Sequence, residues 1–96
     1  MSVRSIAILH CHADAEEAFE LELKKLVEAS ASDEGYIKYE IFQYQDKPYK
    51  YVLLDEWRDA EAFEAHQSTA HYKHFMRVVP VLLEQPLEFH YVSHLV

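Results

Sequence analysis

Residues 36–57 read YIKYEIFQYQDKPYKYVLLDEW and contain two strand-like segments on either side of a short turn. Both segments, residues 36–44 and 49–57, are rich in aromatic and β-branched side chains, which favour extended structure. The four residues between them, Gln45 to Pro48, have the polar, proline-containing composition of a turn. The segment is therefore predicted to form an antiparallel hairpin in the middle of the chain.

The sequence before the hairpin predicts one strand and one helix. Residues 3–12 (VRSIAILHCH) are apolar and β-branched over the length of a strand. Apolar side chains then recur at helical spacing, at Ala15, Phe19, Leu23, Leu26 and Val27. Asp14 is expected to cap this helix, with Glu17 reaching back as in a capping box. Gly35, the only glycine of the chain, is expected to end the connection in a left-handed turn.

The sequence after the hairpin predicts a second helix and a last strand. Asp59 is expected to cap a helix from residue 60 to about 67, and residues 68–70 interrupt it. A helical period resumes over residues 72–83, where Pro80 predicts a kink or an end. Residues 87–95 alternate as a final strand.

The resulting order, β-α-β-β-α-β, predicts a ferredoxin-like α+β fold with a four-stranded antiparallel sheet and both helices on one face. Ile37, Tyr39 and Ile41 are expected on one face of the second strand. The opposite face is expected to carry an aromatic set that is too apolar to remain in water, namely Tyr36, Lys38, Glu40, Phe42 and Tyr44 or their neighbours. We therefore expect a homodimer in which two sheets face each other.

Length and charge limit the possible functions. Ninety-six residues, half of them hydrophobic, are typical of one globular domain spanning residues 1–96. A net charge of −8 argues against nucleic-acid and anionic-membrane partners, and the chain has no apolar run long enough to span a membrane. The single cysteine, Cys11, excludes an internal disulfide and suits the reducing cytoplasm.

Two segments resemble the antibiotic-biosynthesis-monooxygenase (ABM) family of dimeric α/β barrels. Gly35 to Gln43 (GYIKYEIFQ) is similar to the family's second strand, and Glu56 to His66 (EWRDAEAFEAH), continuing to Phe75, is similar to its most recognisable motif. The resemblance implies a homodimer whose sheets face each other, with a pocket in each subunit between sheet and helices. Members of the family include cofactor-free quinol and polyketide monooxygenases, haem-degrading enzymes and processors of a small signalling sugar.

The departures from the family pattern narrow the range of activities that the resemblance implies, because they argue against a haem-degrading enzyme. The haem-degrading members are similar to one another in using a pocket asparagine beside a tryptophan, and this chain has no asparagine. The resemblance places Ala7 near the position of that asparagine, His66 at that of the tryptophan and Met76 at that of the iron-binding histidine. Residues 66–73 look more like the quinol-oxidising and sugar-processing members.

The resemblance suggests an oxidoreductase that acts on a small quinol or dihydroxy-aromatic substrate with oxygen and without metal, flavin or haem. Such chemistry needs a base and a dry aromatic pocket. His66 is the first candidate for the base or hydrogen-bond donor and His71 the second, since an imidazole titrates near neutral pH. The candidates for contacting the substrate are Tyr39, Trp57 and Phe75.

Other interpretations of the same residues remain open. The fold also suits an isomerase of a small phosphorylated sugar, although Lys73 and Arg77 are the few cations near the helices. A pocket already filled by aromatic side chains favours a ligand-binding or structural dimer. His71 and His74 form a His-x-x-His pair, but no third ligand stands at a suitable spacing, so we expect no metal site.

Overall fold

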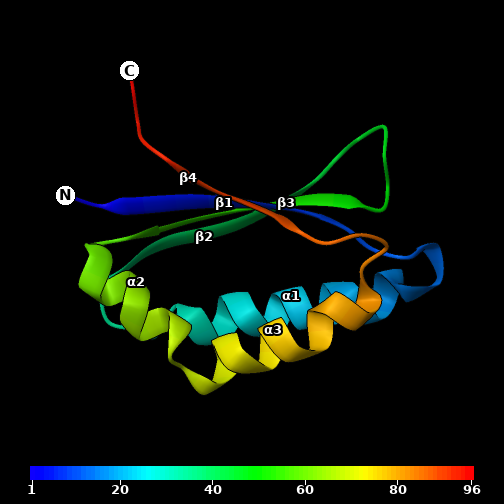
Figure 1. Ribbon diagram of the computed structural model, residues 1–96, viewed down its shortest axis with the longest axis horizontal. Coiled ribbons are helices and arrows are strands. Elements are labelled where there is room, and N and C mark those ends of the chain that lie inside the picture. Colours follow the sequence, from blue (N-terminus) through cyan, green and yellow to red (C-terminus); the bar gives the residue numbers. More distant parts are fainter.

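The computed structural model describes residues 1–96 and shows the predicted order of elements, with the second predicted helix divided into two (Figure 1). The strands are β1 (Val3–His10), β2 (Tyr36–Gln43), β3 (Lys50–Trp57) and β4 (Glu88–Val92). The helices are α1 (Glu16–Ser30), α2 (Ala60–Gln67) and α3 (Ala70–Leu82). The strands pair antiparallel in the order β2-β3-β1-β4, and all the helices lie on one face of the sheet. The predicted ferredoxin-like α+β fold is confirmed.

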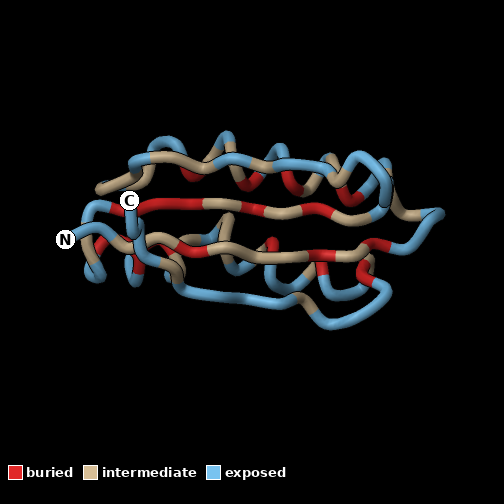
Figure 2. Tube along the Cα trace, turned by 90° about the horizontal axis from the view of Figure 1, so that it is seen from above, coloured by how far each residue is buried: buried red, intermediate tan, exposed pale blue.

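The main core lies between the sheet and helices α1 and α3. Buried positions recur along the inner sides of these elements, while the connecting loops are exposed (Figure 2). Each fully buried aliphatic or phenylalanine side chain stabilises the fold by about 1.5–3 kcal/mol. The buried set comprises Leu9, Cys11, Phe19, Leu23, Leu26, Tyr51, Leu53, Phe75, Val79 and Leu83. None of the helices is both long enough and apolar enough to cross a membrane.

The ends of the helices differ in part from the prediction. Asp59 caps α2 as expected, because the Ala62 N–H donates to its carboxylate at 2.8 Å. The predicted cap at Asp14 is wrong: a short 3-10 turn (Ala13–Ala15) precedes α1, and no side chain caps either. Helix α3 runs two residues beyond Pro80 to Leu82. The last strand is shorter than predicted, since β4 covers only Glu88–Val92.

The predicted faces of β2 are wrong at its first residues. Tyr36 pairs with Trp57 and Lys38 pairs with Glu56, so the register shifts between them and one extra residue, Ile37, is accommodated. Such a bulge turns a side chain to the other face of the sheet. Tyr36 therefore packs edge-on against Trp57, with ring centroids 6.0 Å apart, while Ile37 is 46% exposed. Tyr39 and Ile41 pack against the core as predicted.

The face of the sheet opposite the helices carries a patch of apolar side chains without a cover. Strand pairing places Ile6 beside Leu54 and Ile8 beside Val52, and Val52 beside Phe42, which is half exposed. Arg4 and Glu56 form an ion pair of 2.8 Å at the border of this patch. We refer to Ile6, Ile8, Phe42, Val52 and Leu54 as the outer sheet patch.

Gly35 joins α1 to β2 in the left-handed conformation that the sequence predicts, with a φ of 80°. Its carbonyl accepts a hydrogen bond of 2.7 Å from the Arg58 N–H, which holds the turn against the start of α2. A side chain at this position would also collide with Ala62 of α2. The turn therefore requires glycine for two independent reasons.

We expect Gly35→Ala to lower the free energy of unfolding by about 2–4 kcal/mol, because it adds left-handed strain to a steric collision. Denaturant titration of the variant measures this change. Ser32→Ala, an exposed substitution in the same connection, serves as the matched control and should stay within about 0.5 kcal/mol. Equal stability of the two variants would contradict the assigned role of Gly35.

Candidate functional site

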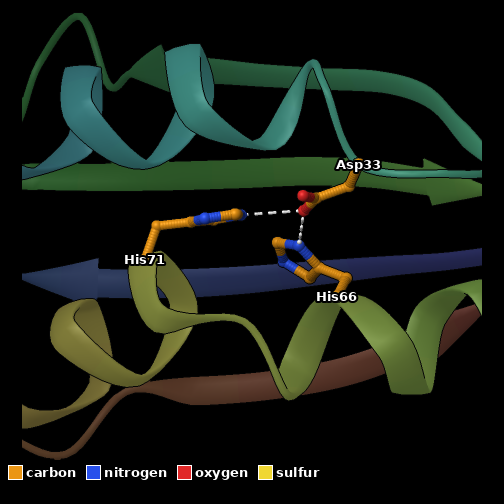
Figure 3. A group of neighbouring side chains, drawn as sticks. All are labelled: Asp33, His66 and His71. Carbon is orange, nitrogen blue, oxygen red and sulfur yellow. Dashed lines mark hydrogen bonds and ion pairs between the residues drawn. The ribbon is translucent and has the colours of Figure 1, made fainter.

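Three side chains from three separate segments meet at one end of the helical layer. Asp33 lies in the connection after α1, His66 in the last turn of α2, and His71 in the first turn of α3 (Figure 3). The same oxygen of Asp33, Oδ2, lies 2.8 Å from Nδ1 of His66 and 2.8 Å from Nε2 of His71. Because an ionised carboxylate only accepts hydrogen bonds, both imidazoles donate to it. We refer to these three residues as the Asp33 cluster.

The break between α2 and α3 brings the two histidines to one carboxylate. The Thr69 hydroxyl donates to the His66 carbonyl at 2.7 Å and accepts from the Tyr72 N–H at 3.2 Å. The same side chain thus ends α2 and caps the start of α3. This short connection sets the direction in which His71 leaves its helix.

His66 is almost fully buried, with 1% of its surface exposed. Its ring stacks on Trp57 at a centroid distance of 4.2 Å, and Tyr39 and Tyr72 approach it edge-on. Burial lowers the pKa of His66, although the Asp33 carboxylate opposes this shift. With Nδ1–H donated to Asp33, Nε2 carries a lone pair, and no hydrogen-bond partner reaches it. His66 is therefore a neutral, oriented imidazole in the core.

His71 is the accessible member of the pair. Its side chain is 26% exposed and lines a groove of about 370 Å³ between α1 and α3. Next to it in the groove, Nε2 of His74 lies 2.9 Å from the Glu22 carboxylate. The lining residues are Glu22, Lys25, Leu26, Ala29, Ala70, His71, His74 and Phe75. The groove thus combines an apolar floor with a few polar groups.

The structure divides the predicted site residues between this groove and the core. His71 and Phe75 line the groove, while His66 and Trp57 do not. Tyr39 lines a separate hollow of about 210 Å³ beside α1 and also contacts the His66 ring. Trp57 is fully buried, and its indole N–H donates to the Asp55 carboxylate at 2.7 Å.

Asp33 is the residue that sequence reasoning missed. Sequence spacing relates His71 only to His74, but in the structure His74 contacts Glu22 while His71 joins Asp33 and His66. One nitrogen from each of these two histidines and one oxygen of Asp33 lie within 4.8 Å of one another, so this cluster has the donors to hold a metal ion. The available signal was an acidic residue two positions before the only glycine, at the predicted start of β2.

Comparison with known proteins agrees with the fold and the motifs. The model of the family described as "Antibiotic biosynthesis monooxygenase" matches residues 2–78. The chain belongs to the antibiotic biosynthesis monooxygenase (ABM) family. The Bacillus subtilis protein named "Putative monooxygenase YcnE" is 30% identical over 82 residues, which is 85% of this chain and 86% of that protein.

Solved structures show the same ABM fold. The structure of PA3566 from Pseudomonas aeruginosa is 28% identical, with a TM-score of 0.89, and covers 99% of this chain and 95% of its own. The structure of Rv0793 from Mycobacterium tuberculosis has a TM-score of 0.93 at 23% identity and covers 100% and 97% of the two chains. The arrangement of sheet and helices is therefore common to this chain and these proteins.

We expect Asp33→Ala to destabilise this ABM domain by about 1–3 kcal/mol, because the buried Nδ1–H of His66 loses its acceptor. Asp46→Ala is the control, since Asp46 is exposed in the connection between β2 and β3. Urea denaturation of the two variants and the parent chain measures the difference. Similar small effects at both positions would show that the Asp33 cluster contributes little to stability.

Proposed function

We propose that this ABM domain is a cofactor-independent monooxygenase that oxidises a small quinol or dihydroxy-aromatic compound with oxygen. The observation that carries the proposal is the Asp33 cluster, in which one carboxylate orients two imidazoles beside a ligand-sized groove. Membership of the ABM family and the printed name of the Bacillus subtilis relative support the reaction class.

The groove between α1 and α3 suits a small aromatic ligand. Its volume of about 370 Å³ lies at the lower end of the range for small-molecule pockets, about 300–1,000 Å³. Leu26, Ala29 and Phe75 provide apolar surface, and His71 provides a polar contact that links directly to Asp33. A flat ring with a hydroxyl group directed at His71 satisfies both features.

The histidine pair supplies the base for the first step. One imidazole takes a phenolic proton from the substrate, and the Asp33 carboxylate compensates the positive charge that this creates. His71 contacts the groove and can meet the substrate directly, while His66 is enclosed, and its unprotonated Nε2 does not line the groove. The substrate anion then reduces oxygen: one oxygen atom enters the ring, the other leaves as water, and the quinol becomes a hydroxylated quinone. The substrate supplies all the electrons.

A second candidate, a non-catalytic ligand-binding dimer, is favoured by how tightly the aromatic side chains are packed. Trp57 is fully buried and Phe75 is 4% exposed, so both contribute to the core.

The alternative of a sugar-phosphate isomerase gains less support. Lys25 of the groove pairs with Glu22 at 3.3 Å, and Arg77 lies near His74, at 3.4 Å. Lys25 and Arg77 thus already contact other side chains, and Lys73 is exposed and does not line the groove, so the groove offers no unengaged cation for a phosphate.

Oxygen consumption with a simple quinol tests the proposed reaction. We expect His66→Gln and His71→Gln each to lower the rate by about 10²-fold, since general-base catalysis contributes on that scale. His94→Gln, in the exposed C-terminal segment, should keep the parent rate. Circular dichroism and thermal melting of each variant confirm that it remains folded.

Full oxygen uptake by both folded histidine variants would refute the assigned base. Absence of uptake by the parent chain with any quinol, together with binding of small aromatics in the groove, would favour the non-catalytic candidate instead.

We also propose that two copies associate through the outer sheet patch, as the uncovered apolar face and the family suggest. A cytoplasmic location fits the single, buried cysteine, Cys11. Leu54→Arg places a charge in the patch and should convert the dimer to a monomer in sedimentation experiments. Val81→Arg, at a position of α3 that is 77% exposed, is the control and should leave the dimer intact. A parent chain that sediments as a monomer would overturn the proposal.

A further inference from the structure

The Asp33 cluster has the chemical composition of a transition-metal site. Its ligand atoms are two imidazole nitrogens and one carboxylate oxygen, and they lie within 4.8 Å of one another. Two histidines and one carboxylate are a recurring ligand set for zinc and for non-haem iron, whereas calcium and magnesium prefer oxygen ligands alone. We propose that Asp33, His66 and His71 bind one divalent first-row transition-metal ion per chain.

The three ligand atoms must change their separations to hold an ion. Ligands of a tetrahedral ion with bonds near 2.0–2.1 Å are about 3.3 Å apart. The Asp33 oxygen lies 2.8 Å from each imidazole nitrogen, so each of these contacts opens by about half an ångström when an ion binds. The two nitrogens, which lie within 4.8 Å of each other, must also reach about 3.3 Å, and their protons move to Nε2 of His66 and Nδ1 of His71. Asp33 lies in a loop, and His71 lies in the first turn of a helix, so both can make this adjustment.

The surroundings hold one ligand rigid and leave one side open. Trp57 stacks on the His66 ring and Tyr72 meets it edge-on, which fixes the direction of Nδ1 before an ion arrives. On the other side, the His71 side chain is 26% exposed and lines the groove between α1 and α3. An ion can therefore enter through the groove, and a coordination position stays open for water or a ligand. The overall charge of −8 further favours a cation.

Metal binding and base catalysis use the same side chains. An ion held by Nδ1 of His66 and Nε2 of His71 occupies the positions from which both imidazoles donate to Asp33, so the bound form lacks the oriented histidine pair described above. The metal site itself does not depend on the proposed oxidation. It requires only the three side chains in their observed arrangement.

Zinc binding to the full-length chain tests the inference directly. The protein is treated with a chelator, dialysed, and titrated with Zn²⁺ in competition with a chromogenic indicator. We expect one tight equivalent per chain and a rise in melting temperature. His71→Ala and Asp33→Ala should each weaken binding by 10-fold or more, after circular dichroism has confirmed that both variants fold.

His74→Ala is the matched control, because His74 lies one turn from His71 but contacts Glu22 instead. It should retain the parent affinity. Absence of a stoichiometric site in the parent chain, or equal affinity in the His71→Ala variant, would overturn the proposal.

Oxygen uptake separates this inference from the proposed function. If both hold, one equivalent of Zn²⁺ inhibits quinol oxidation in the parent chain. Stoichiometric zinc binding in a chain that never consumes oxygen with quinols supports the metal site and rejects the proposed monooxygenase. A strict requirement for Fe²⁺ in turnover also supports the metal site and rejects the metal-free mechanism.

Discussion

The pair of hydrogen bonds that Asp33 accepts from His66 and His71 is the constraint on which this end of the molecule depends. They connect the loop after α1 to the junction of α2 and α3. Asp33 lies 33 residues before His66 and 38 residues before His71 in the sequence. A buried imidazole without a partner for its N–H would cost about 1–3 kcal/mol. The Gly35 turn holds the loop against α2 through the Arg58 hydrogen bond, and so places Asp33 where it can prevent that loss.

The break at Thr69 is the second requirement for this arrangement. In one continuous helix, two residues five positions apart point in directions that differ by about 140° and cannot share a carboxylate oxygen. By capping α3 and binding the end of α2, Thr69 reorients His71 toward the atom that His66 already contacts. The break between the two helices thus brings both imidazoles to the same carboxylate. A longer connection would hold the two rings less firmly.

Local patterns in the sequence were sufficient for most of the fold. The hairpin over residues 36–57, the Asp59 cap and the left-handed Gly35 all depend on neighbouring residues, and all are confirmed. The cap predicted at Asp14 also depends on neighbouring residues and is wrong. Other errors arise where distant contacts decide. The register shift at Ile37 follows from how Tyr36 packs on Trp57, and the Asp33 cluster joins segments that no spacing rule relates. His66 and His71 were recognisable from their motif, but the acid that unites them was visible only in three dimensions.

The charge of the Asp33 cluster explains why it can serve more than one purpose. With both imidazoles neutral, it carries one uncompensated negative charge in a half-buried position, where added positive charge is stabilised. A proton taken from a ligand brings the cluster to neutrality, and a divalent ion brings it to one positive charge. Because His66 is enclosed and His71 is open to the groove, either must arrive through His71. What occupies the groove beside His71 therefore decides whether the cluster takes up a proton or a metal ion, and with it the chemistry that the site can perform.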